Sequence, residues 1–501
     1  MRWLAVLAAL TAVSAVRGEM EYATPESQGV DSAGILRWLD DCERTFDGVK
    51  EGRLHGFVIV RHGKVIAEGS WKPFDTLNEP HMLYSHSKSF TSSAVGFLVD
   101  DGRLDLDERV ADVFPEDVPA DADAGVREIR IRDLLTMNVG SDLNHDVPKF
   151  PDWRRRFFER RLDRKPGTGF KYDSDATYML AAVVEKRSGR KLMDFLRERM
   201  FSRIGIEKAW STTSPQGIAC GGWGMNMTTR EIARFGQLYL QQGRWNGEQL
   251  LSPYWVTLAT ARHTWSGWQK VGAQRLGEGT DWEQGYGFQF WRCTHGAYRA
   301  DGASGQYTIV LPAEDAVVSI NAGLNDMQKE LALVWDDLLP AMKSAPLPEG
   351  AATKALAERC SALAYPALTG PRGDGAAFFG TDIVLDRNSR GFVRVRVDRA
   401  ESGYRLTLEV PAGVQRIPVG DGEWKHGELA IDTQLFESLG LYIGPHRSAA
   451  SAGFDAEGVF RIKVYLVRDT GDITLAIRPD GRLEGRFNAM AGCGLKGAVA
   501  P

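Results

Sequence analysis

Five serines and one lysine interrupt an apolar stretch at residues 83–99, LYSHSKSFTSSAVGFLV. Ser85 and Lys88 are three positions apart, so on a helix they lie on one face and within reach of each other. A serine hydroxyl needs a base to become a good nucleophile, and a lysine can be that base only if burial lowers its pKa by roughly 3 units. The spacing is therefore typical of a nucleophile and its base. Capping of the helix by Ser85 or Ser87, beside a solvated Lys88, is the alternative.

The sequence lacks the motifs of several other hydrolases. It contains no G-x-S-x-G nucleophile elbow and no H-E-x-x-H zinc motif. A second S-x-x-K, from Ser188 to Lys191, leads into no apolar run and indicates a turn. The five cysteines are scattered and form no C-x-x-C pair, so we expect neither a metal nor a cofactor. A net charge of -5 without a basic patch argues against nucleic acid and leaves a small molecule or peptide as the expected partner.

The elements that position Ser85 and Lys88 follow from hydrophobic periodicity. An amphipathic pattern predicts a helix over 32–46, and two apolar runs around His62-Gly63 predict a β-hairpin over 56–71. Helical patterns follow between 129 and 243. Strand patterns return at GYGFQFWRC (285–293) and over 305–323, before a helix over 326–342. Strands at both ends with helices between them predict an α+β fold in which the two ends share one sheet.

Composition divides the 501-residue chain further. Arg2, the apolar run over 4–13 and the small residues Ser14 and Ala15 are typical of a signal peptide over 1–18, so we expect an exported protein, periplasmic or secreted; a buried N-terminal helix is the alternative. No later segment has the ~18 apolar residues of a transmembrane span. We expect the main domain over 19–343, a linker with a short helix over 344–369, and a β-rich domain over 370–501, an all-β barrel or sandwich.

Four stretches together resemble one known family. They are YSHSKSFTS, PGTGFKYDSDATYMLAAVVEKRSG, GGWGMNMTTREIARFGQLYLQQGRWNGEQLLS and GASGQYTIVLP. In this order they resemble the serine β-lactamase and penicillin-binding-protein superfamily, and more narrowly its class C branch, which includes esterases, D-aminopeptidases and 6-aminohexanoate-dimer hydrolases. The resemblance covers about residues 22–342. It implies an antiparallel sheet flanked by helices, with a helical subdomain.

The resemblance also implies roles for single residues. Ser85 becomes the acylated nucleophile and Lys88 its cationic or basic partner. Tyr172 matches the motif tyrosine, which as a phenolate beside Lys88 would be the general base and later protonate the leaving group. The alternative for Tyr172 is a hydrophobic staple before a helix capped by Ser174 or Asp175. Ser174 stands where the family usually has asparagine, and its hydroxyl can still hydrogen-bond Lys88.

The third family motif, Lys-Thr-Gly or His-x-Gly, falls on Ala300-Asp301-Gly302. The resemblance implies that Gly302 lets a strand approach the acyl group closely and that the backbone N–H groups of Ala303 and Ser85 form the oxyanion hole. The cation of the motif is missing, which weakens recognition of a carboxylate unless Arg299 or Arg292 replaces it.

The expected function is therefore an exported serine hydrolase that cleaves esters or small amides and peptides. A β-lactamase or D,D-carboxypeptidase is the alternative enzyme. A catalytically weak protein that binds a ligand on the same scaffold is the non-enzymatic alternative, and the C-terminal domain is expected to contact cell wall or another partner.

Overall fold

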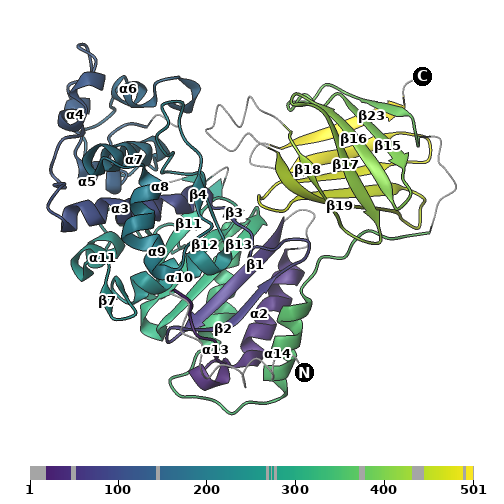
Figure 1. Cartoon of the computed structure of the whole chain (residues 1–501), viewed down its shortest axis with the longest axis horizontal. Coiled ribbons are helices and arrows are strands. Elements are labelled where there is room, and N and C mark those ends of the chain that lie inside the picture. Colours follow the sequence, from purple (N-terminus) through teal and green to yellow (C-terminus); the bar gives the residue numbers. More distant parts are fainter. Residues whose placement is uncertain are drawn as a thin grey trace.

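The computed structural model describes residues 18–46, 52–142, 147–266, 270–271, 274–275, 279–371, 378–431, 445–488 and 492–499. The predicted signal peptide over 1–18 lies outside the described residues except for Gly18. The described chain is α+β, with a six-stranded sheet, helices around it and a separate ten-stranded sheet (Figure 1). The predicted fold class is thus confirmed.

The six-stranded sheet joins the two ends of the first region, as predicted. Its order is β10-β11-β12-β13-β1-β2, and each neighbouring pair is antiparallel. His62 and Gly63 connect β1 to β2 with φ angles of 48° and 75°, which suit the two-residue turns that favour hairpins. The strands are β1 (Gly52–Arg61), β2 (Lys64–Ser70), β10 (Trp291–Arg292), β11 (Tyr298–Gly302), β12 (Gln306–Leu311) and β13 (Ala316–Leu324).

Helices cover both faces of this sheet. On one face lie α2 (Ser32–Thr45), α12 (Met327–Leu333) and α14 (Ala351–Ala362), which share a hydrophobic core with the sheet. On the other face α10 (Thr229–Leu240) packs against β1, β12 and β13. The helix α14 falls in the predicted linker, yet it packs against α2 and β2 and buries Leu356. The predicted domain limits stay a prediction.

A helical layer surrounds the buried helix α3 (Ser87–Asp100). Its members include α5 (Ile131–Leu135), α6 (Trp153–Phe158), α7 (Ser174–Ser188), α8 (Leu192–Leu196) and α11 (Pro253–Thr260). The strand predicted over 285–293 is wrong except at Trp291–Arg292. The reason is that Ser92 and Ser89 of α3 donate to the carbonyl oxygens of Phe288 and Gln289 at 2.7 Å each, so these groups bind a helix instead of a neighbouring strand.

The C-terminal strands form a closed barrel, one of the two predicted architectures. Antiparallel neighbours run from β17 through β14 and β23 to β19, and a parallel pairing of Gly420 with Ser451 and of Asp421 with Ala452 joins β17 to β19. The strands are β14 (Asp382–Leu385), β15 (Arg394–Arg399), β16 (Tyr404–Val410), β17 (Gly413–Asp421), β18 (Lys425–Leu429), β19 (His446–Phe454), β20 (Phe460–Leu466), β21 (Asp472–Ile477), β22 (Leu483–Asn488) and β23 (Cys493–Val499).

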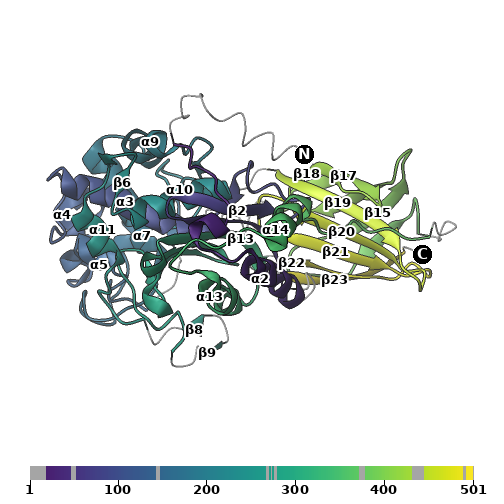
Figure 2. The same cartoon turned by 90° about the horizontal axis from the view of Figure 1, so that it is seen from below.

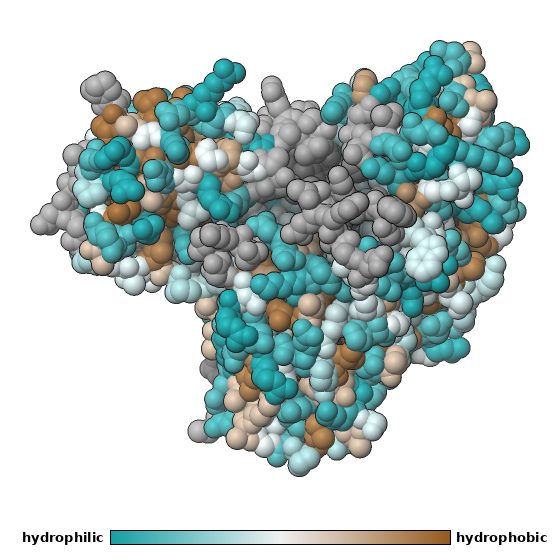
Figure 3. Space-filling model, turned by 180° about the vertical axis from the view of Figure 1, so that it is seen from behind, coloured by the Kyte–Doolittle hydropathy of each residue, from teal (hydrophilic) through white to brown (hydrophobic). Residues whose placement is uncertain are grey.

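Two views agree on the arrangement of these parts. The helical layer lies at one end of the molecule and the barrel at the other, with the six-stranded sheet between them (Figures 1 and 2). On the face seen in Figure 3, hydrophobic residues outside the grey atoms form scattered patches among hydrophilic ones. Among the described helices, none is both long enough and apolar enough to cross a bilayer.

Candidate active site

Ser85 lies on a tight turn between a short strand and the buried helix α3. The strand is β3 (His81–Met82), and the turn is a 3-10 helix over Tyr84–His86, so α3 itself begins two residues after Ser85. Ser85 is half-buried, whereas its neighbours from His81 to Leu98 are buried. The turn therefore presents the Ser85 hydroxyl at the rim of an otherwise closed core.

Lys88 contacts the Ser85 hydroxyl from inside the protein. Its Nζ donates to Ser85 Oγ at 3.0 Å, to Ser174 Oγ at 2.8 Å and to the carbonyl oxygen of Gly222 at 2.6 Å. Lys88 is only 1% exposed, so the alternative of a solvated lysine beside a helix cap is wrong. Three acceptors fix the amine next to Ser85.

Burial also changes the proton affinity of Lys88. It lowers the pKa of the Lys88 amine to about 7, although the carboxylates of Asp173, Asp175 and Asp301 act in the opposite direction. Asp173 and Asp175 lie 2.6 and 3.7 Å from Arg160. The positive charge of Arg160 reduces the effect of these two carboxylates on the pKa of Lys88. Near neutral pH the Lys88 amine is therefore partly unprotonated and able to accept a proton.

Tyr172 closes the other side of Ser85. Lys88 Nζ lies 4.8 Å from the centre of the Tyr172 ring, and the nearby Ser85 hydroxyl acts to lower the pKa of Tyr172. The ring stacks on Trp291 at 5.7 Å and meets Tyr286 edge-on at 6.2 Å. Burial raises the pKa of Tyr172, so its hydroxyl stays protonated at neutral pH. This environment disfavours the phenolate that the family resemblance implied.

Ser174 contacts Lys88 because another residue caps its helix. Asp173 Oδ1 accepts from the backbone N–H groups of Asp175 and Ala176 at 2.9 and 3.3 Å, so Asp173 caps α7. The cap at Ser174 or Asp175, which belonged to the alternative interpretation of Tyr172, is therefore wrong. Asp173 satisfies the free N–H groups of the helix, which leaves the Ser174 hydroxyl available to Lys88.

The third motif passes directly over the turn that carries Ser85. A Cβ atom on Gly302 would lie 2.1 Å from the carbonyl oxygen of Leu83 and 3.1 Å from the backbone nitrogen of His86, so only glycine fits. Ala303 is the residue after Gly302 in the chain. Gln306, which is fully buried, donates to the carbonyl oxygens of Ala303 and Ala322 at 3.2 and 2.5 Å and holds the turn after β11 in place.

Neither neighbouring arginine replaces the missing cation at Ala300. Arg299 is fully buried, donates to Asp301 Oδ2 at 2.7 Å and lies 4.5 Å from the Trp282 ring. Arg292 donates to the carbonyl oxygen of Thr260 at 3.0 Å. Burial raises the pKa of Asp301 to about 6, against the opposing effect of Arg299. The two charges at this motif thus neutralise each other.

Sequence reasoning found the residues brought together here but missed several that hold them. Ser85, Lys88, Tyr172 and Ser174 meet as expected, and Gly302 lies beside the Ser85 turn, with Ala303 next to it in the chain. The missed groups are the helix cap Asp173, the brace Gln306 and the carbonyl oxygen of Gly222. Asp173 stands before a predicted helix, which is a signal for capping. The other two have no local signature. Among the described residues, no group of three metal-ligating side chains occurs.

Known proteins resemble this chain in sequence. The chain matches the Beta-lactamase family over residues 39–336. It is 26% identical over 320 residues to a 6-aminohexanoate-dimer hydrolase of Paenarthrobacter ureafaciens, covering 59% of this chain and 78% of the relative. It is 28% identical over 278 residues to a penicillin-binding protein 4 of Amycolatopsis lactamdurans, covering 47% and 70%.

Solved structures show the same fold. A penicillin-binding protein homologue from Caulobacter crescentus superposes with a TM-score of 0.51 at 16% sequence identity, covering 65% of this chain and all of that one.

Proposed function

The chain belongs to the β-lactamase family of serine hydrolases, and we propose that it works through an acyl-enzyme on Ser85. The observation that carries the proposal is the buried Lys88 amine, which contacts Ser85 Oγ at 3.0 Å and has a pKa of about 7. A neutral amine in this place can accept the serine proton at neutral pH.

The proposed reaction has two halves. Ser85 Oγ attacks the carbonyl carbon of the substrate while its proton passes to Lys88, and the backbone N–H groups of Ser85 and Ala303 bind the oxyanion. Tyr172, which stays protonated, passes a proton to the departing alcohol or amine and takes one back from Lys88. In the second half water attacks the acyl carbon, its proton returns through the same groups, and the carboxylic acid product leaves Ser85 free.

The proposed substrates are neutral esters and small amides or peptides. Ala300 offers no cation at the third motif, and Arg299 is already paired with Asp301. A substrate carboxylate would lose water there without gaining a partner, at a cost of a few kcal/mol. The relative named a 6-aminohexanoate-dimer hydrolase supports the inclusion of small amides. A β-lactamase or D,D-carboxypeptidase remains the alternative enzyme.

A comparison of two chromogenic substrates tests this preference. We expect kcat/KM for p-nitrophenyl acetate to exceed that for nitrocefin by about 100-fold, because nitrocefin carries a carboxylate. Ala300→Lys should narrow the gap by improving nitrocefin alone. Faster turnover of nitrocefin by the wild-type protein would favour the β-lactamase alternative.

Covalent labelling separates the hydrolase from a catalytically weak binding protein. A fluorophosphonate probe should label the wild-type protein on Ser85, and Ser85→Ala should lose both labelling and ester hydrolysis while keeping its melting temperature. An unlabelled but folded wild-type protein would support the non-enzymatic alternative. Full activity in a clean Ser85→Ala preparation would refute the acyl-enzyme.

Export is a further part of the proposal, and it rests on the sequence of residues 1–18 alone. Expression of the full chain in a Gram-negative host should give a mature protein in the periplasm or medium whose first residue follows Ala15 or Gly18. N-terminal sequencing of that protein checks this, and an intact N-terminus in the cytoplasm would refute it.

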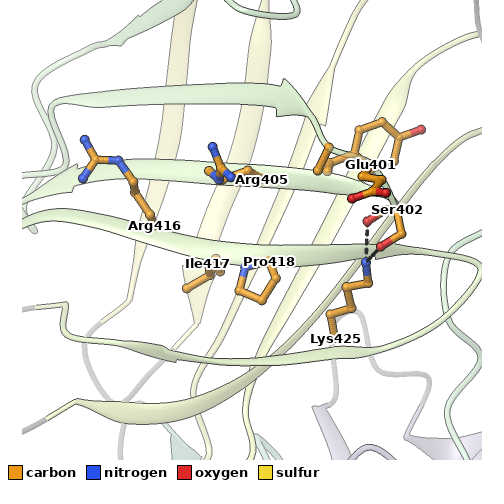
Figure 4. A pocket seen from close by; sticks show the side chains of 9 residues that line it. Glu401, Ser402, Arg405, Arg416, Ile417, Pro418 and Lys425 are labelled. Carbon is orange, nitrogen blue, oxygen red and sulfur yellow. Dashed lines mark hydrogen bonds between the residues drawn. The ribbon is translucent and has the colours of Figure 1, made fainter.

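We also propose that the barrel contacts the cell wall through its outer face. Two neighbouring hollows of about 360 and 390 Å³ share Arg405 and Arg416, and Figure 4 shows both side chains beside the first hollow. Neither arginine forms an ion pair with the described residues, whereas Lys425 is held by Ser402 at 2.6 Å. Co-sedimentation with purified anionic cell-wall polymer should weaken in the Arg405→Gln, Arg416→Gln double variant. A wild-type protein that stays in the supernatant would refute the contact.

A further inference from the structure

The barrel reaches the turn that carries Ser85 through the loop between β20 and β21. Tyr84, the residue before Ser85, donates its hydroxyl proton to Asp469 Oδ1 of this loop at 2.6 Å. Thr470 Oγ1 lies 3.1 Å from the same hydroxyl. Tyr84 and Asp469 are 7% and 6% exposed, so the contact is shielded from water. A residue 385 positions away thus binds the immediate neighbour of Ser85.

Tyr84 has a backbone conformation that needs such support. Its φ angle is 48°, in the left-handed region that bulky residues rarely occupy. Conformations of this kind persist only where the surroundings hold them, and they are frequent at functional sites. The carbonyl oxygen of Tyr84 accepts from Ser87 Oγ at 2.6 Å, which holds the backbone end of the residue. Asp469 holds the far end of its side chain.

The same loop also binds the strand that leads into the turn. The backbone N–H of Met82 donates to the carbonyl oxygen of Arg468 in this loop at 2.9 Å. The next N–H, that of Leu83, donates to the carbonyl oxygen of Met225, outside the barrel, at 2.9 Å. The barrel therefore touches the chain on the N-terminal side of Ser85 at two places, Met82 and Tyr84. Leu83, whose carbonyl oxygen lies against Gly302, stands between these two residues in the chain.

Contacts within the barrel hold Asp469 in place. The backbone N–H of Asp469 donates to the carbonyl oxygen of Leu466 at 3.0 Å, and the N–H of Thr470 donates to Asp469 Oδ1 at 2.6 Å. His446 Nδ1 lies 3.6 Å from the other carboxylate oxygen. These contacts restrain the Asp469 carboxylate and so orient the acceptor of the hydrogen bond from Tyr84.

We propose that Asp469 is a positioning residue for the hydrolase reaction: through Tyr84 it sets where Ser85 Oγ lies relative to Lys88 and Tyr172. The inference rests on the proposed function, because it takes Ser85 as the nucleophile. A misplaced Ser85 Oγ slows both halves of the reaction, because it attacks in the first half and is the leaving group in the second, so kcat falls while KM changes little.

Contacts between the barrel and the loop before β3 provide the matched comparison. Glu79 of this loop pairs with Arg447 and, at 3.1 Å, with Arg468 of the barrel. If Asp469 only helps to attach the barrel, loss of the Glu79 contacts should have the same effect on activity. If Asp469 positions Ser85, only changes at Asp469 and Tyr84 should lower kcat.

The experiment uses the full chain and p-nitrophenyl acetate. Tyr84→Phe removes a single oxygen, and Asp469→Ala removes its acceptor. Each should lower kcat about tenfold or more with KM within twofold, and the double variant should be no slower than the slower single variant. Asp469→Asn, whose amide oxygen can still accept the hydrogen bond, should recover kcat to within about threefold of wild type. Glu79→Gln should keep wild-type kcat.

The outcomes separate this inference from the proposed function. If Ser85 reacts with the fluorophosphonate probe but Tyr84→Phe keeps wild-type kcat, the positioning role is refuted and the hydrolase stands. Losses that multiply in the double variant, or an equal loss in Glu79→Gln, also refute it. Full activity in Ser85→Ala would refute the proposed function itself. If Asp469→Ala fails to fold, kcat of Tyr84→Phe alone still decides whether the contact positions Ser85.

Discussion

Strand β16 of the barrel and helix α3 beside Ser85 place their polar residues in opposite ways. In β16, Leu406, Leu408 and Val410 are buried, while the alternate residues Arg405, Thr407 and Glu409 face outward. In α3, by contrast, Lys88 and five hydroxyl-bearing residues are as buried as the apolar ones. These five are Ser87, Ser89, Thr91, Ser92 and Ser93, and each makes a hydrogen bond.

The difference separates residues that specify a fold from residues that build a site. Alternation is enough to close the barrel, because each strand needs only one apolar face. A buried polar helix costs free energy unless every group finds a partner, so it persists where the partners serve another purpose. The substitutions below test whether the buried polar groups of α3 and its surroundings contribute more to activity and to the free energy of unfolding than the surface polar groups of the barrel do.

The largest effect is expected at Lys88. Lys88→Ala should lower kcat/KM for p-nitrophenyl acetate at least about 100-fold, because a positioned base contributes roughly that much. Steady-state kinetics together with circular dichroism checks this in a folded variant. A variant with wild-type kinetics would show that the buried amine serves only the packing of α3.

Ser92 tests the structural part of the same helix. Ser92→Ala removes the donor to the carbonyl oxygen of Phe288, which is left buried without that partner. The free energy of unfolding should fall by about 1–3 kcal/mol, with kcat of the folded protein little changed. Urea unfolding measures it. If the free energy of unfolding falls by less than a few tenths of a kcal/mol, the buried hydroxyl of Ser92 contributes no more to stability than a polar group on the barrel surface.

The acidity of Lys88 predicts a pH dependence. Only the neutral amine accepts a proton, so kcat/KM should rise with pH and level off above about 7. The ionised Asp301 carboxylate favours the charged amine and raises its pKa. Asp301→Asn should therefore move the rising limb to lower pH, by about half a unit. The exposed Asp336→Asn serves as the control, and a limb that moves to higher pH would contradict the assignment.

The smallest effect is expected on the outer face of the barrel. Arg394 pairs with Asp382 at 2.7 Å and with Glu409 at 2.5 Å, but its side chain is 45% exposed. Arg394→Gln should lower the free energy of unfolding by much less than Ser92→Ala does, because water screens exposed ion pairs. A loss as large as that of Ser92→Ala would show that the barrel depends on its surface charges.

Local patterns predicted the elements and much of the site. The His62-Gly63 hairpin and the helices near 32–46 and 174–188 follow from periodicity and turn residues, and the spacing of Ser85 and Lys88 places their side chains 3.0 Å apart. The strand predicted over 285–293 failed because its hydrogen-bond partners are side chains of α3, which periodicity does not reveal.

The contribution of the barrel could not be predicted from these patterns. Asp469 meets Tyr84 across 385 residues, and the loop that carries it has the composition of an ordinary turn. Such a contact depends on how two folded parts pack together. The contact of Lys88 with the carbonyl oxygen of Gly222 could not be predicted either. Every residue has a carbonyl group, and only the path of the folded backbone determines its direction.

Closure of the barrel has a consequence for self-association. An open sheet edge invites pairing with another chain, and this is a common route to aggregation. The parallel pairing of β17 with β19 joins the two sides of the barrel, so this part of the chain gives a neighbouring molecule little backbone to extend. On the six-stranded sheet, the outer edge of β2 is covered where Val65 pairs with Tyr22 and where the following Lys72 pairs with Ala364. At these two edges a second copy therefore has few free backbone groups to pair with, so sheet-mediated association is disfavoured there.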